Sequence, residues 1–155
     1  MSMVRCYDAA GNAVVVAPDA LTFRPAVYGI FIENQQIVLL EHADTKLWYP
    51  PGRILQSHEV PTQVVRHTFR QVTDMMPALG SLLFVEDQYR VDENGRAWHL
   101  SALYYALVRA QITTATFSGL SADPQYEWIP LSALKRERMM FGFEAIQAGR
   151  LRLHL

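Results

Sequence analysis

The chain has 155 residues, of which 50% are hydrophobic, and a formal net charge of -1. This length fills one core and is too short for two ordinary domains, and the balanced charge argues against general binding to nucleic acid or to a membrane. No apolar run approaches the roughly 18 residues that span a bilayer, no leader segment is recognisable, and the single Cys6 excludes an intrachain disulfide. We therefore expect one cytoplasmic domain over residues 1–155.

The first predicted element is a β-hairpin within residues 1–20, ahead of a core that we expect over residues 24–147. Its arms are short apolar runs on either side of Gly11-Asn12, a pair that is typical of tight turns. Val14 to Val16 would place apolar side chains near an edge of the sheet. Such an edge favours association with a second copy, so the sequence indicates a homodimer.

Two strands are predicted next, at residues 24–33 and 36–42, because both runs are rich in Val, Ile, Leu and aromatic residues. Asn34-Gln35 between them suits a tight turn. The two strands should therefore be antiparallel neighbours in the sheet.

The stretch from Trp48 to Met75 is predicted to be a loop that leads into a helix. Prolines and Gly52 punctuate the loop, and Pro61 suits the first helical turn, where its missing N–H would be unpaired anyway. Apolar residues then recur at helical spacing, so one face of the helix should pack on a sheet. These residues are Val60, Val64, Val65, Phe69, Val72, Met75 and Met76.

A long hairpin should follow this helix. Its arms are the strand-like runs 79–91 and 97–110, which flank Asn94-Gly95, the strongest short hairpin signal in the chain. The second arm is apolar nearly throughout, which is typical of a central strand covered on both faces.

The last third of the chain is predicted to contain a polar loop at 113–124, a strand at 126–130, and a helix at 141–147 that Gly149 ends. Helices interleaved with these strands predict an α/β/α sandwich with a mixed, largely antiparallel sheet.

The loop and helix resemble the box of the Nudix superfamily, Gly-x5-Glu-x7-Arg-Glu-U-x-Glu-Glu-x-Gly-U, where U is aliphatic and Trp-x-Leu-Pro-Gly leads in. Trp48, Pro51 and Gly52 match the lead-in, and Glu59 matches the first glutamate. The order of elements resembles the Nudix fold as well. The match is nevertheless a degenerate box from Gly52 to Met75, because other residues stand at most of its charged and glycine positions. These are Arg53, His67, Thr68, Gln71, Val72 and Asp74.

In a working box, helix glutamates at i, i+3 and i+4 put three carboxylates on one edge to hold Mg or Mn against a diphosphate. Here that edge is Thr68, Gln71 and Val72, which offers a hydroxyl, a neutral amide and a methyl pair. Hard divalent cations need several anionic oxygens, so we expect no cofactor at the box. If a metal binds, the resemblance points to Glu59 and Glu86.

The resemblance also points to ligand contacts for several side chains, each with an alternative left open. Arg24 stands where relatives often place an arginine on a phosphate or base, or it forms a surface ion pair. Arg53 replaces a glycine in the loop that would approach a diphosphate, or it points to water. His67 could supply positive charge, and Tyr28 could stack on a base, but lone histidines and strand aromatics are commonly structural.

The remaining candidates are acids and Gln71, which replaces a box glutamate. Glu59 could hold a metal, support the loop or cap the helix. Glu86 and Asp87 stand where some relatives carry a further metal-binding acid, but neighbours on a strand face opposite ways, so at most one can reach the site. Asp123 and Glu127 are weaker candidates of the same kind.

Two functions remain open on this resemblance. In the first, the pocket binds a nucleotide-like ligand, a nucleoside diphosphate linked to another moiety, without the standard metal-dependent hydrolysis; non-hydrolytic Nudix-like domains are known. In the second, the chain is an active Nudix hydrolase (a pyrophosphohydrolase) that uses Mg or Mn held by Glu59 and by acids outside the box.

Overall fold

The computed structural model describes residues 2–110 and 126–155. The predicted loop at 113–124, and with it Asp123, lies outside the described residues. In chain order the described elements are β1 (Val4–Tyr7), β2 (Ala13–Val16), η1 (Pro18–Ala20), β3 (Leu21–Glu33), β4 (Gln36–Glu41), β5 (Trp48–Tyr49), β6 (Gly52–Ile54), α1 (Pro61–Thr73), β7 (Pro77–Val91), β8 (Ala97–Arg109), β9 (Tyr126–Pro130), η2 (Leu131–Ala133), η3 (Arg136–Arg138) and α2 (Phe143–Arg152).

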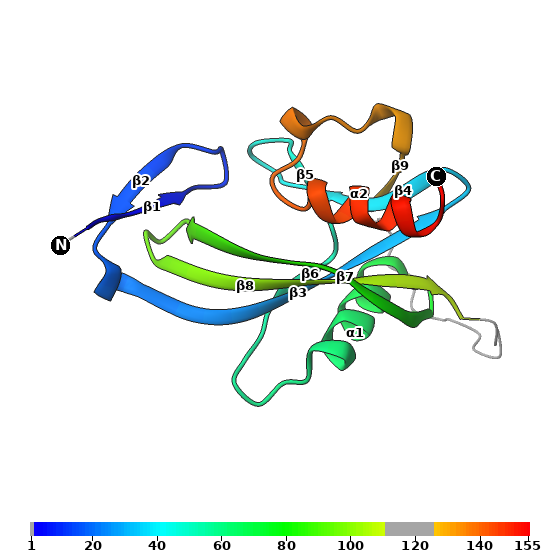
Figure 1. Cartoon of the computed structure of the whole chain (residues 1–155), viewed down its shortest axis with the longest axis horizontal. Coiled ribbons are helices and arrows are strands. Elements are labelled where there is room, and N and C mark those ends of the chain that lie inside the picture. The colour runs from blue at the N-terminus through cyan, green and yellow to red at the C-terminus, as the bar shows by residue number, and fades with distance from the viewer. Residues whose placement is uncertain (1, 111–125) are drawn as a thin grey trace.

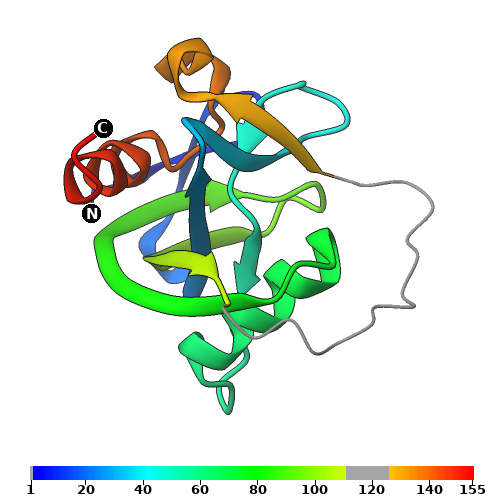
Figure 2. The same cartoon turned by 90° about the vertical axis from the view of Figure 1, so that its right-hand side faces the viewer.

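The strands form a mixed sheet in the order β2-β1-β7-β8-β3-β4-β5, with β6 paired to β3 and β9 to β4. The pairs β7/β8 and β3/β4 are antiparallel, whereas β3 and β8 run parallel. Figures 1 and 2 show α1 and α2 on opposite sides of the long strands β3, β7 and β8. The predicted α/β/α arrangement is confirmed, with β8 as a central strand.

Alternation along β3 divides the core in two, because successive strand residues face opposite ways. Val27 and Phe31 face α1 and pack with its Phe69. Tyr28 and Ile30 face the other side, where α2 and β9 complete a second cluster. One strand therefore serves both layers of the sandwich.

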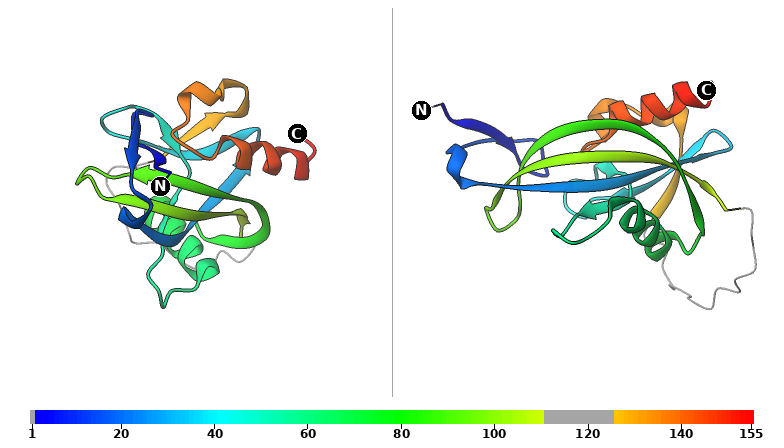
Figure 3. Two further views of the ribbon diagram at one scale, coloured as in Figure 1. Left: turned by 60° about the vertical axis from the view of Figure 1, so that its left-hand side comes forward. Right: turned by 60° about the horizontal axis from the view of Figure 1, so that its bottom comes forward.

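The tight turns form at the predicted positions. Asn34 and Gln35 both have positive φ, 51° and 63°, as the central residues of a two-residue hairpin turn require. The N-terminal hairpin forms as β1 and β2 and joins the main sheet through the pair Tyr7 and Arg90. Figure 3 shows this hairpin at one end of the long strands.

Helix α1 follows the prediction closely. Pro61 occupies its first turn, Val64, Val65 and Phe69 are buried, and Asp74 ends it in the left-handed conformation with φ of 59°. Glycine would adopt that conformation at no cost, and a short polar side chain such as that of aspartate tolerates it. The helix therefore ends in the left-handed conformation without a glycine at this position.

Helix α2 differs from the prediction, because Gly149 does not end it. The helix continues to Arg152 and Gly149 is buried within it. A Cβ at this position would lie 3.3 Å from both Ile30 and Leu83, so the glycine lets the helix approach the sheet. No helix in the described parts of the chain is long and apolar enough to cross a membrane.

Replacing Phe69 by alanine should destabilise the protein by about 3–5 kcal/mol, because its ring is fully buried and stacks on Phe31 at 4.8 Å. Chemical denaturation of both proteins measures this loss. Phe23→Ala is the matched control, since Phe23 is 56% exposed, and should cost about 1 kcal/mol or less. Equal losses in the two variants would contradict the assignment of the helix face.

Candidate functional site

The loop between β6 and α1 is held against β3 at its start. Gly52 has φ of 156°, and a Cβ there would collide with the Val27 carbonyl oxygen. The glycine thus allows β6 to pair directly with β3, where Arg53 stands beside Val27 in the ladder. This pairing fixes the direction in which the box loop leaves the sheet.

Glu59 and Arg53 close the loop with a bidentate ion pair. Arg53 donates from Nη1 and Nη2 to the two carboxylate oxygens over 2.7 and 2.6 Å, and the Gln56 N–H donates to Oε1 over 2.8 Å. The Arg53 hydrogen bond is the main cause that lowers the pKa of Glu59 from 4.5 to about 2. Among the described residues, Glu59 supports the loop and makes no hydrogen bond to the first turn of α1.

The helix edge that a metal-binding box would use is neutral here. Thr68 is buried and its Oγ1 has no hydrogen-bond partner in the described structure, Gln71 is exposed, and Val72 is half-buried. A single hydroxyl and an amide lack the anionic oxygens that Mg or Mn requires. The residues present on this edge therefore do not fit a divalent metal ion.

A cleft of about 460 Å³ lies beside the box loop, and we call it the arginine cleft. Its charged groups are Arg53, Arg90 and the titratable His42, with no carboxylate in its lining. Arg90 forms no ion pair with any described residue. Its lining residues are Tyr28, His42, Tyr49, Gly52, Arg53, Ile54, Arg90, Met140 and Phe141.

Aromatic rings hold the Arg90 guanidinium in this cleft. Arg90 lies over the Phe141 ring at 4.8 Å, and Phe141 packs against Tyr28 at 4.8 Å and Tyr49 at 5.8 Å. Burial raises the pKa of the Tyr28 hydroxyl, and the nearby Arg90 partly opposes this rise. The result is a cation placed among aromatic side chains, a combination suited to an anion attached to a flat ring.

A second cavity of about 490 Å³ adjoins the cleft and shares Arg90, Met140 and Phe141 with it; we call it the acidic groove. The N-terminal hairpin turn, β7 and the segment before α2 form its walls. Glu86 of β7 lines it and accepts hydrogen bonds from the Tyr104 hydroxyl at 2.6 Å and from Gln88 at 3.1 Å. Figure 3 shows the hairpin and the long strands that frame this region.

The structure brings some of the predicted site residues together and leaves others apart. Tyr28 and Arg53 line the arginine cleft, and Glu86 lines the adjoining groove. Helix α1 carries His67 in a separate hollow of about 230 Å³. Asp87 also lines the groove. Gln71, exposed on α1, Arg24 on β3 and Glu127, exposed on β9, lie outside both cavities.

Sequence reasoning missed Arg90 and Phe141. A signal for Arg90 was present in the alternation Glu86, Gln88, Arg90, which puts three polar side chains on one face of a strand. Phe141 comes from a distant segment, and no local pattern ties it to Arg90.

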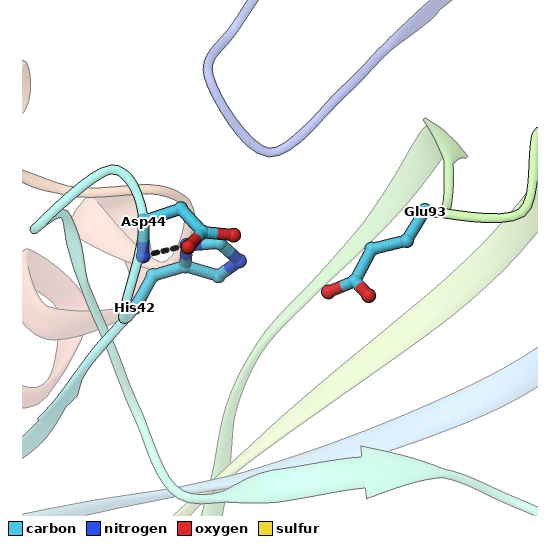
Figure 4. A group of neighbouring side chains, drawn as sticks. All are labelled: His42, Asp44 and Glu93. Carbon is cyan, nitrogen blue, oxygen red and sulfur yellow. Dashed lines mark hydrogen bonds between the residues drawn. The ribbon is translucent and has the colours of Figure 1, made fainter.

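Within the described residues, His42, Asp44 and Glu93 bring three potential metal ligands within 4.8 Å of one another. Figure 4 shows His42 and Asp44 on one loop, with Glu93 facing them from the turn between β7 and β8. His42 Nδ1 accepts the N–H groups of Asp44 and Thr45, each at 3.3 Å. In neutral histidine the other nitrogen then carries the proton, so a metal would have to displace this turn.

Solved structures with the same fold identify the architecture. No family model and no curated protein sequence matches the chain. A NUDIX hydrolase from Nitrosomonas europaea superposes with a TM-score of 0.59 and 12% identity, covering 84% of this chain and 90% of that one. An ADP-ribose pyrophosphatase from Streptococcus suis gives 0.59 and 10%, covering 86% and 94%. An Ap4A hydrolase from C. elegans gives 0.59 and 13%, covering 85% and 99%. The chain has the Nudix fold.

Glu59 should stay ionised to unusually low pH. Because the folded state lowers its pKa from 4.5 to about 2, its stabilising effect is complete above pH 4.5 and is lost as the pH falls toward 2. An NMR titration of side-chain carboxyl carbons should give a midpoint near 2 in the native protein and nearer 4.5 in Arg53→Ala, with Glu59→Gln assigning the signal. A native midpoint near 4.5 would show that the ion pair does not form.

Proposed function

We propose that the chain binds a nucleoside-diphosphate-linked ligand in the arginine cleft and does not carry out the standard metal-dependent hydrolysis of the Nudix box. The observation that carries this proposal is Arg90, a cation without an ion-pair partner in the described structure, placed against Phe141 and beside the box loop. Guanidinium groups match the geometry of phosphate oxygens and bind them by charge-assisted hydrogen bonds. Arg90 therefore takes the diphosphate.

The aromatic walls suit the nucleoside. Tyr49 and Phe141 are only half-buried, so part of each ring remains accessible from the cleft. A nucleobase that stacks on such a ring gains apolar contact and needs no base-specific hydrogen bonds. Tyr28 is almost fully buried, and its ring packs against the ring of Phe141.

Arg53 has a smaller role in this proposal than the resemblance implied. Glu59 already compensates its charge and holds both terminal nitrogens, so Arg53 shapes the loop and contributes less to anion binding than Arg90 does. His67, Gln71 and Arg24 lie outside the lining of the cleft, and the ligand contacts predicted for them stay predictions.

The alternative is an active hydrolase of nucleoside diphosphates linked to another moiety, a reaction class that the names of the neighbouring structures favour. It would need Mg or Mn held by Glu59, Glu86 and other acids outside the box. Glu59 is engaged by Arg53, and Glu86 by Tyr104 and Gln88. Recruiting them would cost these interactions, which supports the binding function.

The binding function can be tested with ADP and inorganic pyrophosphate by isothermal titration calorimetry. Both should bind equally well with Mg and with a chelator, and more weakly at high salt. Arg90→Ala should weaken binding by about tenfold to a hundredfold, as expected for loss of a charge-assisted contact worth about 1.5–3 kcal/mol. Arg66→Ala, on the exposed face of α1, is the matched control and should leave binding unchanged.

The hydrolase alternative is decided by assays of ADP-ribose, dinucleoside polyphosphates and nucleoside triphosphates with and without Mg or Mn. We expect no metal-stimulated turnover. Robust turnover that Glu59→Gln abolishes would overturn the proposal and assign the metal to Glu59 together with acids outside the box.

We further propose that residues 1–155 act as one domain that pairs with a second copy through β2. This strand forms an edge of the sheet, and Val14 and Val15 on it are 38% and 57% exposed. Light scattering should give twice the chain mass of 17.7 kDa, and Val15→Lys should shift the protein toward the monomer. A native protein that stays monomeric at high concentration would refute this pairing.

A further inference from the structure

The inward face of β7 continues the arginine cleft into the acidic groove. Glu86, Gln88 and Arg90 stand at every second position of β7, so their side chains lie on one face of the strand, and all three line the groove, whose lining also includes Asp87 and Tyr89. Arg90 lines both cavities, which places Glu86 and Gln88 beyond it on the groove side. A ligand whose phosphates reach Arg90 can therefore extend toward these two residues.

The side-chain amide of Gln88 has a fixed orientation. Its Nε2 donates to the Tyr104 hydroxyl at 2.9 Å and to Glu86 at 3.1 Å, while the Tyr104 hydroxyl donates to the same Glu86 oxygen at 2.6 Å. Burial first, and then the Glu86 charge, raise the pKa of Tyr104, so its hydroxyl stays a donor. Flipping the amide would turn its carbonyl oxygen toward a carboxylate, which only accepts hydrogen bonds.

This orientation leaves a buried acceptor without a donor. Gln88 is 9% exposed, and its Oε1 has no hydrogen-bond partner in the described structure. The second oxygen of Glu86 likewise accepts no hydrogen bond from a described residue. The buried Gln88 oxygen is costly while it is unpaired, and Glu86 is half-buried, so the two oxygens are suited to a ligand group that donates hydrogen bonds.

The charge of the groove points to the same chemistry. Its lining contains five carboxylates and two guanidinium groups. Asp87 pairs with His99, Glu144 pairs with Arg136, and Asp8 accepts hydrogen bonds in its own turn. Asp8, Glu86 and Glu137 are then the groove acids without a cationic partner among the described residues. A further phosphate would be repelled here, whereas a neutral or cationic donor would be attracted.

We propose that the acidic groove takes the moiety attached beyond the diphosphate, and that Gln88 and Glu86 select a moiety with at least two hydrogen-bond donors, such as a vicinal diol or a primary amine. This inference rests on the proposed function, since Arg90 must first hold the phosphates. Gln88 is thus a specificity-determining residue, and Tyr104 is the positioning residue that fixes its amide.

The test uses ADP esters that differ only in the group on the terminal phosphate. The ethyl ester offers no donor, the 2,3-dihydroxypropyl ester offers a diol, and the 2-aminoethyl ester offers an amine. Calorimetry on the native protein should show the diol or the amine ester binding about tenfold more tightly than the ethyl ester, as expected for one or two added hydrogen bonds. The better of the two identifies the donor type.

The variant Gln88→Met keeps the side-chain length and removes the acceptor. It should bind the ethyl ester as the native protein does and lose the preference for the donor esters to within about twofold. Glu86→Gln is the second variant, because it frees the Gln88 amide to flip and should reduce the same preference. Glu127→Gln, an exposed acid on β9 outside both cavities, is the matched control and should retain it.

Two results would overturn the inference in different ways. If ADP and the ethyl ester bind through Arg90 but the donor esters bind no better, or if the preference survives in Gln88→Met, the groove does not select donors and only this inference fails. If neither ADP nor any ester binds the native protein, the proposed function fails and the inference fails with it.

Discussion

The ion pair between Arg53 and Glu59 is the constraint on which the character of the site depends. It engages the one glutamate that the box retains and, at the same time, the arginine that replaces the first box glycine. The pair is partly exposed, so its direct contribution to stability is small. The consequence concerns ligand binding. Each side chain of the pair is engaged by the other, so Arg90 on β7 carries the uncompensated positive charge of the cleft.

Arg90 then links two cavities of opposite character. On one side the lining is aromatic and basic, and on the other it carries an excess of carboxylates. A guanidinium between them can hold an anionic group, because Phe141 supports its face and no described carboxylate forms an ion pair with it. A ligand with a phosphate in its middle and polar donors at one end matches this order of charges. A ligand with a terminal run of phosphates does not.

The sequence predicted most of the framework because the signals for it are local. Asn94-Gly95 marks the long hairpin, and the spacing of Val64, Val65 and Phe69 marks the buried face of α1. The predicted helix end at Gly149 was wrong, because a glycine that ends a helix and a glycine that lets a helix approach a sheet look alike in sequence. The candidate functional site was harder to predict than the fold. The contact of Arg90 with Phe141, and the orphaned oxygen of Gln88, depend on packing between distant segments.

The neutral edge of α1 shows how the fold can form with Thr68, Gln71 and Val72 in place of carboxylates on this edge. Three carboxylates within one helical turn repel one another, and a divalent ion relieves that repulsion. Thr68 and Val72 remove the repulsion instead, and Thr68 turns the same position into part of the buried face. The helix then needs no ion to be stable. The layers that hold α1 in place, with Phe69 against Phe31, involve no carboxylate on this edge.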